Sequence, residues 1–548
     1  MKILLAAVNA KYIHSNLAVY SLKAVTRSWG AQVEIGEYTI NQQQDEILGD
    51  IYRRKPDVVA FSCYIWNRRI IGELLEELPK ILPGVKLWAG GPEVSYDAAD
   101  FLKEYPQVCG VMRGEGEYIF RRLAAYYIEG TGTLDGIEGL TFRDAEGNIR
   151  ENPDAAPVDM DEIPFAYEDF FEFKNKIIYY ESSRGCPFRC SYCLSSIDKR
   201  VRYRSMELVK QELGRFLEER IPQVKFVDRT FNCNPARTRE LWSWMTEHDN
   251  GVTNFHFEIA ADLITEEELE LMSRMRPGLI QLEIGVQSTN PDTVRRIDRT
   301  MDLEKLSEMV SRVKGFENIH QHLDLIAGLP GENLESFQRS FDHVFRMEPE
   351  QLQLGFLKVL KGAKMHRDAS EYGIVYHGQP PYEVFSTNWI SYEEILLLKG
   401  VEEMVEVYYN SHQFEQTLQK LLERYESPFA FFRELAVYYE TEGYHAVSHS
   451  RMARYEILRE FLHRKGWTER LYDQCMVYDL YARENLKSRP EFAADTGKYK
   501  EQLKEYARIY GRQVHIEVFE LEDGPMFVLF DYSRRSPLTN EAGVEVLK

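Results

Sequence analysis

The sequence predicts an α/β protein in three parts: a doubly wound parallel sheet, a partial α/β barrel and a mainly helical C-terminal region. Apolar runs of strand length alternate with stretches of helical period over residues 1–130, and the same alternation returns over residues 176–365. Helical spacing dominates the rest of the chain. We therefore expect domains at residues 1–130, 176–365 and 366–548, with residues 131–175 as a linker.

The composition is that of a globular protein with full hydrophobic cores. The 548 residues are 44% hydrophobic and 28% charged, and their formal net charge is −21. An acidic excess disfavours nucleic acid as a partner, because phosphate binding draws on clustered cations. No apolar run approaches the roughly 18–20 residues that span a bilayer. The apolar start of the chain fits a buried strand rather than a signal peptide, so we expect a cytoplasmic protein without membrane partners.

Five apolar runs in the first domain have the length of buried strands. Parallel sheets covered on both faces bind their ligands at the carboxyl ends of the strands. The runs lie at residues 3–8, 33–38, 58–62, 85–89 and 108–112, with helical stretches such as 70–82 between them. The strand ends carry residues 9–16, Ser62, Gly90-Gly91-Pro92 and Gly114-Glu115.

The linker and the second α/β part follow. A hairpin is expected at residues 139–150, turning near 145–148, and Pro153, Pro157 and Pro164 then favour an extended connection. Six units of strand then helix favour a partial or complete barrel over a second open sheet, with the chemistry in the loops after the strands. The strands are expected at 177–182, 225–230, 254–261, 279–287, 319–327 and 351–359, and helices between them include 206–220, 265–275, 303–314 and 334–346.

The C-terminal region reads mainly as helices. Residues 393–409, 413–424, 429–442 and 452–465 have helical spacing, and strands at 514–520 and 526–532 flank a hairpin turn at 522–525.

Three cysteines form the strongest motif, at Cys186, Cys190 and Cys193. Three thiolates on a tight loop can hold three irons of a 4Fe–4S cube and leave the fourth iron open. A structural zinc knuckle is the alternative, but zinc sites close with four ligands and no further Cys or Cys/His pair lies nearby. Seven cysteines in total, an odd number, argue against a disulfide scaffold. Cys233 fits a half-buried loop thiol better than an active-site thiol, and Cys109 and Cys475 fit core positions.

The spacing Cys-x3-Cys-x-aromatic-Cys after the first barrel strand resembles the radical S-adenosylmethionine (SAM) family. The resemblance implies that the amino and carboxylate groups of SAM chelate the fourth iron. It also implies that an electron from the cluster cleaves SAM into methionine and a 5′-deoxyadenosyl radical. Tyr192, the aromatic position of the motif, would then pack near the adenine.

The later strand ends match the same family in order. Residues 226–232 end the second strand, Glu258 and Asp262 the third, Gln287 the fourth, and residues 324–331 with Gly328 the fifth. The resemblance implies SAM contacts from Glu258, Gln287, Gly328 and Arg204. Taken singly, an acidic residue at a strand end also fits a helix cap or a turn, and Arg204 also fits a surface charge beside a helix.

A doubly wound domain ahead of such a barrel resembles the cobalamin-binding class of the superfamily. The resemblance implies that the nucleotide tail of cobalamin runs along the strand ends. Ser62 and Gly90-Gly91-Pro92 would leave room for the tail, because bulky side chains would block it, and Gly114-Glu115 lies at the same edge. The alternative is a plain strand-to-helix turn.

The first loop departs from the Asp-x-His-x-x-Gly pattern of many corrinoid enzymes. Tyr12 stands where Asp would precede His14, and Leu17 stands where the Gly would follow. We therefore expect no protein nitrogen on the lower face of cobalt, and a contact between His14 and the corrin edge or a helix N-terminus.

The resemblance implies a cobalamin-dependent radical SAM methyltransferase. It would move a SAM-derived methyl group through methylcobalamin to an unactivated carbon of a small-molecule or peptide substrate, with an electron donor such as flavodoxin or ferredoxin. The C-terminal region resembles an extension of an uncharacterised subgroup of this class, and either caps the substrate cavity or is ordinary core.

Three alternatives remain open. A cyclase or rearrangement enzyme would use both cofactors without methyl transfer. A methylthiotransferase would need three further cluster cysteines, whereas only Cys63 and Cys109 precede Cys186. A non-catalytic corrinoid-binding protein would need no reducible cluster.

Overall fold

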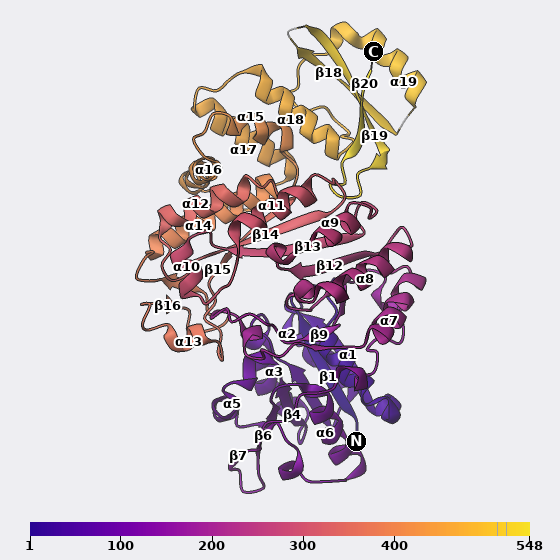
Figure 1. Cartoon of the computed structure of the whole chain (residues 1–548), viewed down its shortest axis with the longest axis vertical. Coiled ribbons are helices and arrows are strands. Elements are labelled where there is room, and N and C mark those ends of the chain that lie inside the picture. The colour runs from indigo at the N-terminus through magenta and orange to yellow at the C-terminus, as the bar shows by residue number, and fades with distance from the viewer. Residues whose placement is uncertain (512, 522, 548) are drawn as a thin grey trace. The chain divides into compact units, whose positions relative to one another are not determined.

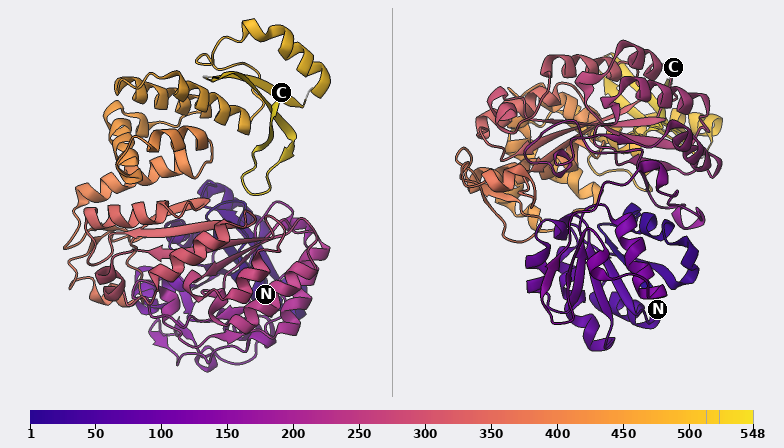
Figure 2. Two further views of the ribbon diagram at one scale, coloured as in Figure 1. Left: turned by 45° about the horizontal axis from the view of Figure 1, so that its top comes forward. Right: turned by 60° about the horizontal axis from the view of Figure 1, so that its bottom comes forward.

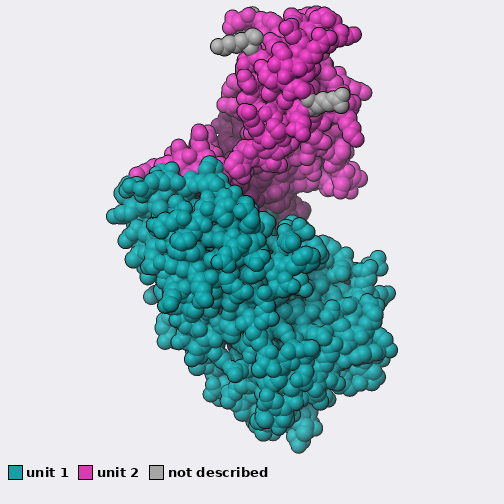
Figure 3. Space-filling model, turned by 90° about the vertical axis from the view of Figure 1, so that its right-hand side faces the viewer, with its two compact units in different colours: residues 1–282, 294–302, 356–388 teal, residues 283–293, 303–355, 389–548 magenta. Residues whose placement is uncertain are grey.

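The computed structural model describes residues 1–511, 513–521 and 523–547 (Figure 1). The chain divides into two compact units, coloured separately in Figure 3. The first unit comprises Met1–Leu282, Val294–Asp302 and Phe356–Asn388, and the second comprises Glu283–Thr293, Leu303–Gly355 and Trp389–Lys548. Among the described residues, no helix is long and apolar enough to cross a membrane.

The N-terminal sheet has seven strands in the order β2-β1-β3-β4-β5-β6-β7. The five expected strands are confirmed as a parallel set. Strand β1 pairs with β2 on one side and with β3 on the other, so the strand order reverses at β1. The hairpin expected at 139–150 is present as β6 and β7, and it extends this sheet antiparallel to β5. The strands are β1 (Ile3–Asn9), β2 (Val33–Thr39), β3 (Val58–Ser62), β4 (Lys86–Gly90), β5 (Val108–Met112), β6 (Leu140–Arg143) and β7 (Ile149–Glu151).

Helices cover both faces of this sheet (Figure 2). Helix α3 presents apolar residues at spacings of three and four, so that one stripe of the helix packs against alternate strand residues. The helices are α1 (Leu17–Ala24), α2 (Gln44–Arg54), α3 (Arg68–Ile81), α4 (Pro92–Ser95), α5 (Ala98–Glu104) and α6 (Gly116–Glu129).

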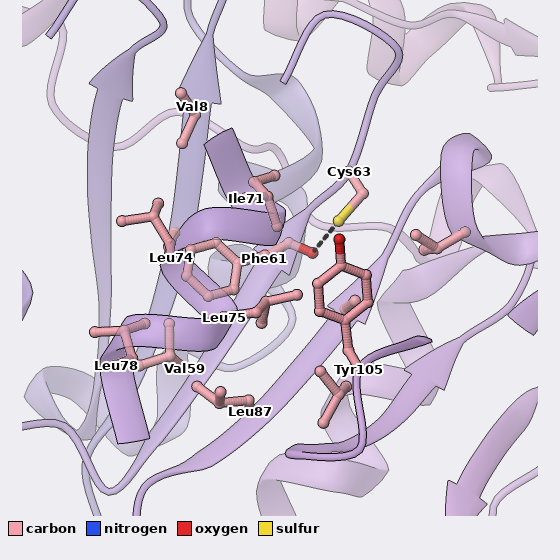
Figure 4. Close-up of a cluster of buried hydrophobic side chains, with 14 of the residues drawn as sticks. Val8, Val59, Phe61, Cys63, Ile71, Leu74, Leu75, Leu78, Leu87 and Tyr105 are labelled. Atoms are coloured by element: carbon pink, nitrogen blue, oxygen red, sulfur yellow. Dashed lines mark hydrogen bonds between the residues drawn. The ribbon is translucent and has the colours of Figure 1, made fainter. Parts of the chain in front are cut away.

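The core between α3 and the sheet is shown in Figure 4. Leu74, Leu75 and Leu78 are fully buried there, and burial of each stabilises the fold by roughly 1.5–3 kcal/mol. Cys63 lies in the same core, with its Sγ atom 3.9 Å from the carbonyl oxygen of Phe61. Burial raises the pKa of the Cys63 thiol to about 12. Cys63 is therefore part of the hydrophobic core of the first sheet.

The second sheet has six strands in the order β15-β14-β13-β12-β11-β8. This order follows the chain and leaves β8 and β15 as separate edges, so the predicted barrel is a partial one. Parallel pairing joins β8 to β11 and β11 to β12. The strands are β8 (Ile178–Tyr180), β11 (Gln223–Phe226), β12 (Asn254–Ile259), β13 (Ile280–Gln287), β14 (His320–Ala327) and β15 (Gln351–Phe356).

Side-chain caps begin several of the helices that follow these strands. Asn234 caps α8 ahead of Pro235, and Thr265 forms a capping box with Glu268 at α9. The helices are α7 (Met206–Glu218), α8 (Pro235–Glu247), α9 (Glu266–Met272), α10 (Pro291–Arg296), α11 (Leu303–Lys314), α12 (Leu334–Phe345) and α13 (Lys364–Asp368). Two short antiparallel ladders pair β9 (Ser183–Arg184) with β10 (Arg202–Tyr203) and β16 (Val375–Tyr376) with β17 (Val384–Ser386).

The C-terminal region contains the four expected helices and the expected strand pair, drawn orange to yellow in Figure 2. Helices α18 and α19 and the third strand, β20, were not predicted. Residue 522 of the expected turn lies outside the described residues. The elements are α14 (Tyr392–Met404), which continues as a π-helical turn (Val405–Tyr409), α15 (Glu415–Leu422), α16 (Pro428–Glu442), α17 (Arg451–Arg464), α18 (Arg470–Arg483), α19 (Lys500–Tyr510), β18 (Val514–Leu521), β19 (Gly524–Arg535) and β20 (Ala542–Leu547).

Candidate functional site

A cavity of about 600 Å³ lies at the carboxyl ends of the N-terminal strands, within the first unit. This is the edge at which doubly wound sheets bind their ligands. Tyr179, Glu181, Val227 and Arg229 of the second α/β part complete its wall. All seven residues that the resemblance assigned to cobalamin line this cavity: His14, Ser62, Gly90, Gly91, Pro92, Gly114 and Glu115. Their role in corrinoid binding stays a prediction.

The glycines of this cavity act for different physical reasons. Gly91 has a φ of 104°, and a Cβ atom there would lie 2.6 Å from the carbonyl oxygen of Cys63. The glycine is thus required by the close approach of two backbone segments. A Cβ on Gly90 would make an ordinary contact, 3.4 Å from the carbonyl oxygen of Met112. The expectation that side chains at both positions would fill a tail channel is therefore corrected for Gly91.

Gly114 is the glycine that borders open space. Its φ is 77°, and a Cβ atom would meet no heavy atom within 4 Å, although the residue lines the cavity. The space beside Gly114 is therefore open, and its left-handed backbone is the reason a glycine is favoured there.

A buried polar network forms one wall of the cavity. The side-chain amide of Asn16 donates to the hydroxyl of Ser62 at 3.2 Å and to the side-chain oxygen of Asn9 at 3.3 Å. Asn16 also accepts a hydrogen bond from the backbone N–H of Val19 and so caps α1. The network fixes the β1–α1 loop against the end of β3. The two asparagines stand in the segment 9–16 but were not singled out from the sequence.

His14 joins this loop to the first strand of the second sheet. Its Nδ1 atom lies 2.7 Å from the hydroxyl oxygen of Tyr179. Burial lowers the pKa of His14, and the charges of Lys11 and Lys225 act in the same direction. The imidazole is therefore neutral near pH 7, with one ring nitrogen already engaged.

An aromatic pair that the sequence analysis missed also lines the cavity. The rings of Tyr64 and Trp66 are stacked with centroids 4.3 Å apart and an interplanar angle of 6°. The indole N–H of Trp66 donates to the carbonyl oxygen of Val8 at 3.2 Å. The available signal was two aromatic residues spaced by two directly after the strand end at Ser62.

The three motif cysteines lie on the loop between β9 and β10. Cys186 and Cys190 are buried, Cys193 is half-buried, and all three are free thiols. A Cβ atom on Gly185 would overlap the carbonyl oxygen of Arg200, so the chain closes tightly before Cys186. Among the described residues no three His, Cys, Asp or Glu side chains are gathered to hold one metal ion.

Arg299 lies against this loop. Its Nη1 atom lies 3.8 Å from the Sγ atom of Cys190 and 3.4 Å from the hydroxyl oxygen of Tyr192. Burial raises the pKa of the Cys190 thiol, and the Arg299 charge opposes this shift. Arg299 was not predicted from the sequence. It lies after helix α10, away from the strand ends at which the motif residues were sought.

Of the predicted SAM contacts, Glu258 ends β12 with its Oε1 atom 3.6 Å from the Nη1 atom of Arg229. Arg204 is buried and forms a bidentate ion pair with Glu212. Its Nη1 atom donates to the carbonyl oxygen of Met160. A SAM contact from Arg204 would require that pair to break.

Gln287 and Gly328 belong to the second unit. Gln287 ends β13 in the left-handed region, with a φ of 69°, and its buried Oε1 atom has no hydrogen-bond partner among the described residues. Such a backbone outlier with an unmatched acceptor points to a ligand site. Gly328 follows β14 with a φ of 82°.

Asp228 holds the chain that leads into the cysteine loop. Its carboxylate accepts hydrogen bonds from the hydroxyls of Ser182 and Ser183, each at 2.6 Å, and from the backbone N–H of Ser182 at 2.9 Å. Burial raises the pKa of Asp228 to about 6, and these three donors oppose the shift. This residue follows β11 in the motif 226–232, where its role was not foreseen.

Comparisons with known families agree with this geometry. Residues 3–124 match the B12 binding domain, residues 180–344 match the radical SAM superfamily, and residues 370–521 match a protein family of unknown function, DUF4080. The chain belongs to the cobalamin-binding class of the radical SAM superfamily. The third match covers the helical extension that marks the expected subgroup of this class.

Several members of this class resemble the chain. It is 28% identical over 300 residues to 2-(S-pantetheinyl)-carbapenam-3-carboxylate methyltransferase from Streptantibioticus cattleyicolor, a match that covers 52% of this chain and 44% of the relative. It is 26% identical over 350 residues to the cobalamin-dependent radical SAM methyltransferase TokK from Streptomyces tokunonensis, covering 58% of this chain and 50% of TokK. The chain thus spans about half the length of these relatives.

A solved structure of this class shares the fold. The cobalamin-dependent SAM radical enzyme OxsB, solved with aqua-cobalamin and SAM bound, superposes with a TM-score of 0.61 and 16% identity. The match covers 87% of this chain and 78% of OxsB.

Proposed function

We propose that this chain is a cobalamin-dependent radical SAM methyltransferase that acts on an unactivated carbon of a small-molecule or peptide substrate. The observation that carries the proposal is the shared cavity. Loops of the N-terminal sheet line it on one side, and Tyr179, Glu181 and Arg229 of the second α/β part line it on the other. A corrinoid held by the first set of loops would face the part of the chain that carries the three cysteines.

The residues present fit both metal-containing groups. Cys186, Cys190 and Cys193 would hold the 4Fe–4S cluster and leave its fourth iron for SAM. The open space beside Gly114 and the polar wall of Asn9, Asn16 and Ser62 would hold the nucleotide tail of cobalamin. When bound, the cluster supplies the electron that cleaves SAM, and cobalamin carries the methyl group.

The chain itself would bind and orient the reactants. Tyr64 and Trp66 offer a flat apolar surface in the cavity, and such surfaces exclude water from a radical site. Arg229 and Glu258 present one positive and one negative group at neighbouring strand ends. Together they could orient a zwitterionic group such as the methionine moiety of SAM.

The remaining partners follow from the same chemistry. A cluster that takes single electrons needs a one-electron donor, such as flavodoxin or ferredoxin. The net charge of −21 supports a substrate other than nucleic acid. Free cysteines on the cluster loop support a reducing compartment such as the cytoplasm. The core position of Cys63 weighs against a methylthiotransferase, because it removes one of the two cysteines that precede the loop.

The test is anaerobic reconstitution of the full chain with iron, sulfide and hydroxocobalamin, followed by incubation with reductant and SAM labelled in its methyl group. Labelled methylcobalamin and 5′-deoxyadenosine are expected, and neither should form in the variant with all three motif cysteines changed to Ala. Cys475→Ala, which changes a half-buried thiol of α18, is the matched control and should form both.

Two outcomes would contradict the proposal. Failure of the reconstituted protein to retain any cobalamin would exclude a cobalamin enzyme. Products from a screened substrate that never carry the labelled methyl group would instead indicate a ring closure or rearrangement that uses the same cofactors.

A further inference from the structure

The base of the cysteine loop is a two-stranded ladder with two arginines directly opposite each other. Strands β9 and β10 pair antiparallel, and Arg184 faces Arg202 in the register. Side chains at opposite positions lie on the same face of a ladder, where like charges repel. Both side chains are largely buried, with 15% and 22% of their surface exposed, so water screens the repulsion poorly. The two arginines therefore need carboxylates close beside them.

Two come from the same segment, since Glu181 pairs with Arg184 at 2.8 Å and Asp198 with Arg202 at 3.2 Å, and the N-terminal domain supplies two more. Glu117, at the start of α6, binds Arg184 through both oxygens, at 2.5 and 3.2 Å. Glu115 lies between the two arginines: it pairs with Arg202, and its Oε2 atom lies 3.3 Å from the Nη1 atom of Arg184. The side chain of Glu117 is only 6% exposed, which makes its ion pair with Arg184 a strong constraint on both segments.

The segment that carries Glu115 and Glu117 also lines the cavity. Gly114, Glu115, Gly116 and Glu117 all line it, and so does Arg184. Arg184 stands two residues before Cys186, and Asp228 fixes the residues just before Arg184 through Ser182 and Ser183. The backbone N–H of Cys186 donates to the carbonyl oxygen of Asp198, which stands four residues before Arg202. The segment from Gly114 to Glu117, which would contact a corrinoid, thus forms ion pairs with Arg184 and Arg202 at the two ends of the loop that would hold the cluster.

We propose that Glu115 and Glu117 couple the two cofactor sites. Binding of the cluster by the cysteine loop would then tighten cobalamin binding in the cavity, and bound cobalamin would tighten cluster binding. The inference rests on the proposed function in one respect: it requires that the chain binds both the cluster and cobalamin. Its physical basis is shared ordering. A group in the cavity fixes the loop from Gly114 to Glu117, the ion pairs pass this constraint to Arg184 and Arg202, and the cysteine loop then has less freedom to lose when it binds iron. Coupling of this kind is reciprocal.

The experiment measures the dissociation constant of hydroxocobalamin for the full chain, with the cluster reconstituted and after its removal by a chelator. In the natural protein, the cluster is expected to tighten binding by about fivefold or more. Glu117→Gln keeps the shape of the side chain and removes its charge. In this variant, the dissociation constants of hydroxocobalamin with and without the cluster should differ by no more than about twofold. Glu104→Gln is the control, because Glu104 binds Arg68 in the same domain at 2.9 Å without lining the cavity.

A second readout follows the iron. Bound hydroxocobalamin should slow the release of iron to bathophenanthroline in the natural protein and in Glu104→Gln, but not in Glu117→Gln. If Glu117→Gln does not accumulate as folded protein, Glu115→Gln serves in its place, since the Glu115 side chain is more exposed. That variant should also weaken the coupling.

The outcomes separate the inference from the proposed function. Natural protein that binds both cofactors with no mutual effect would overturn the coupling, and so would full coupling in both glutamine variants. Natural protein that binds no cobalamin at all would overturn the proposed function itself.

Discussion

The Nη1 atom of Arg299 lies 3.8 Å from the Sγ atom of Cys190, at the buried side of the cysteine loop. A positive charge and an N–H donor beside a cluster sulfur stabilise the reduced form of an iron–sulfur cluster, which carries one more negative charge. The arginine is thus placed to set how readily the cluster accepts an electron.

Replacing Arg299 by Gln is expected to make the midpoint potential of the reconstituted cluster more negative. The change should be on the order of tens of millivolts, since 59 mV corresponds to a tenfold change for one electron. Lys keeps the charge, so Arg299→Lys should recover part of the shift. The measurement is a redox titration followed by electron paramagnetic resonance. An unchanged potential in both variants, with iron content intact, would show that Arg299 has only a packing role.

The cysteines themselves provide the second prediction. Changing Cys186, Cys190 and Cys193 together to Ala should remove bound iron and the broad thiolate–iron absorption near roughly 400 nm. Iron analysis and the visible spectrum check this after anaerobic reconstitution. The single variant Cys233→Ala is the control, because the Cys233 thiol contacts Tyr203 at 3.3 Å rather than a motif cysteine. Zinc at about one per chain in the native protein would favour a zinc knuckle instead.

Gly90 and Gly91 should differ sharply although they are neighbours. Ala at position 91 would meet the carbonyl oxygen of Cys63 at 2.6 Å and adopt a φ of 104°. We expect this variant to lose about 1–3 kcal/mol of stability and most of its cobalamin retention in gel filtration. Gly90→Ala makes only ordinary contacts and should retain both. Equal behaviour of the two variants would contradict the assigned role of the Gly91 backbone.

The lower face of cobalt should carry no protein nitrogen. The His14 ring is held at Nδ1 by Tyr179, and the loop lacks the Asp that orients a ligating histidine in many corrinoid enzymes. Electron paramagnetic resonance of bound cob(II)alamin should therefore show cobalt lines without the triplet splitting that an axial nitrogen causes. The spectrum should be the same in His14→Ala. Triplets in the natural protein that vanish in this variant would make His14 the ligand.

The elements that local patterns govern were predictable from the sequence. Strands β1, β3, β4 and β5 are largely apolar runs that mark a buried parallel sheet, whereas β2 carries Glu34 and Glu37. Because parallel strands end at one edge of the sheet, Ser62 and Gly91 could be expected there together. The ion pair of Arg184 with Glu117 joins residues 67 apart in the chain, and no periodicity marks such a pair. Helix α19 was missed although Leu503, Tyr506, Ala507 and Tyr510 stand at helical spacing, and none of its residues is buried.

Glu332 offers a test in the second unit that does not depend on any cofactor. Its carboxylate is buried after β14 and accepts hydrogen bonds from the hydroxyls of Ser288, at 2.7 Å, and Ser340, at 3.0 Å. Ser288 directly follows Gln287, so this carboxyl group ties the loop after β13 to helix α12. Burial raises the pKa of Glu332 from 4.5 to about 7.

A folded-state pKa above the unfolded value means that the folded state holds the proton more tightly. The stability from protonated Glu332 is therefore fully present below about pH 4.5 and is lost as the pH rises toward 7. The loss is on the order of 3 kcal/mol. Glu332→Gln keeps an acceptor for both serines and cannot ionise, so it should be more stable than the natural protein at pH 8 and comparable at pH 4.5. Urea midpoints at both pH values measure this. Because Asp479 has its pKa raised to about 7 as well, the difference between the two proteins isolates the contribution of Glu332. Parallel pH profiles for the two proteins would show that folding does not raise the pKa of Glu332.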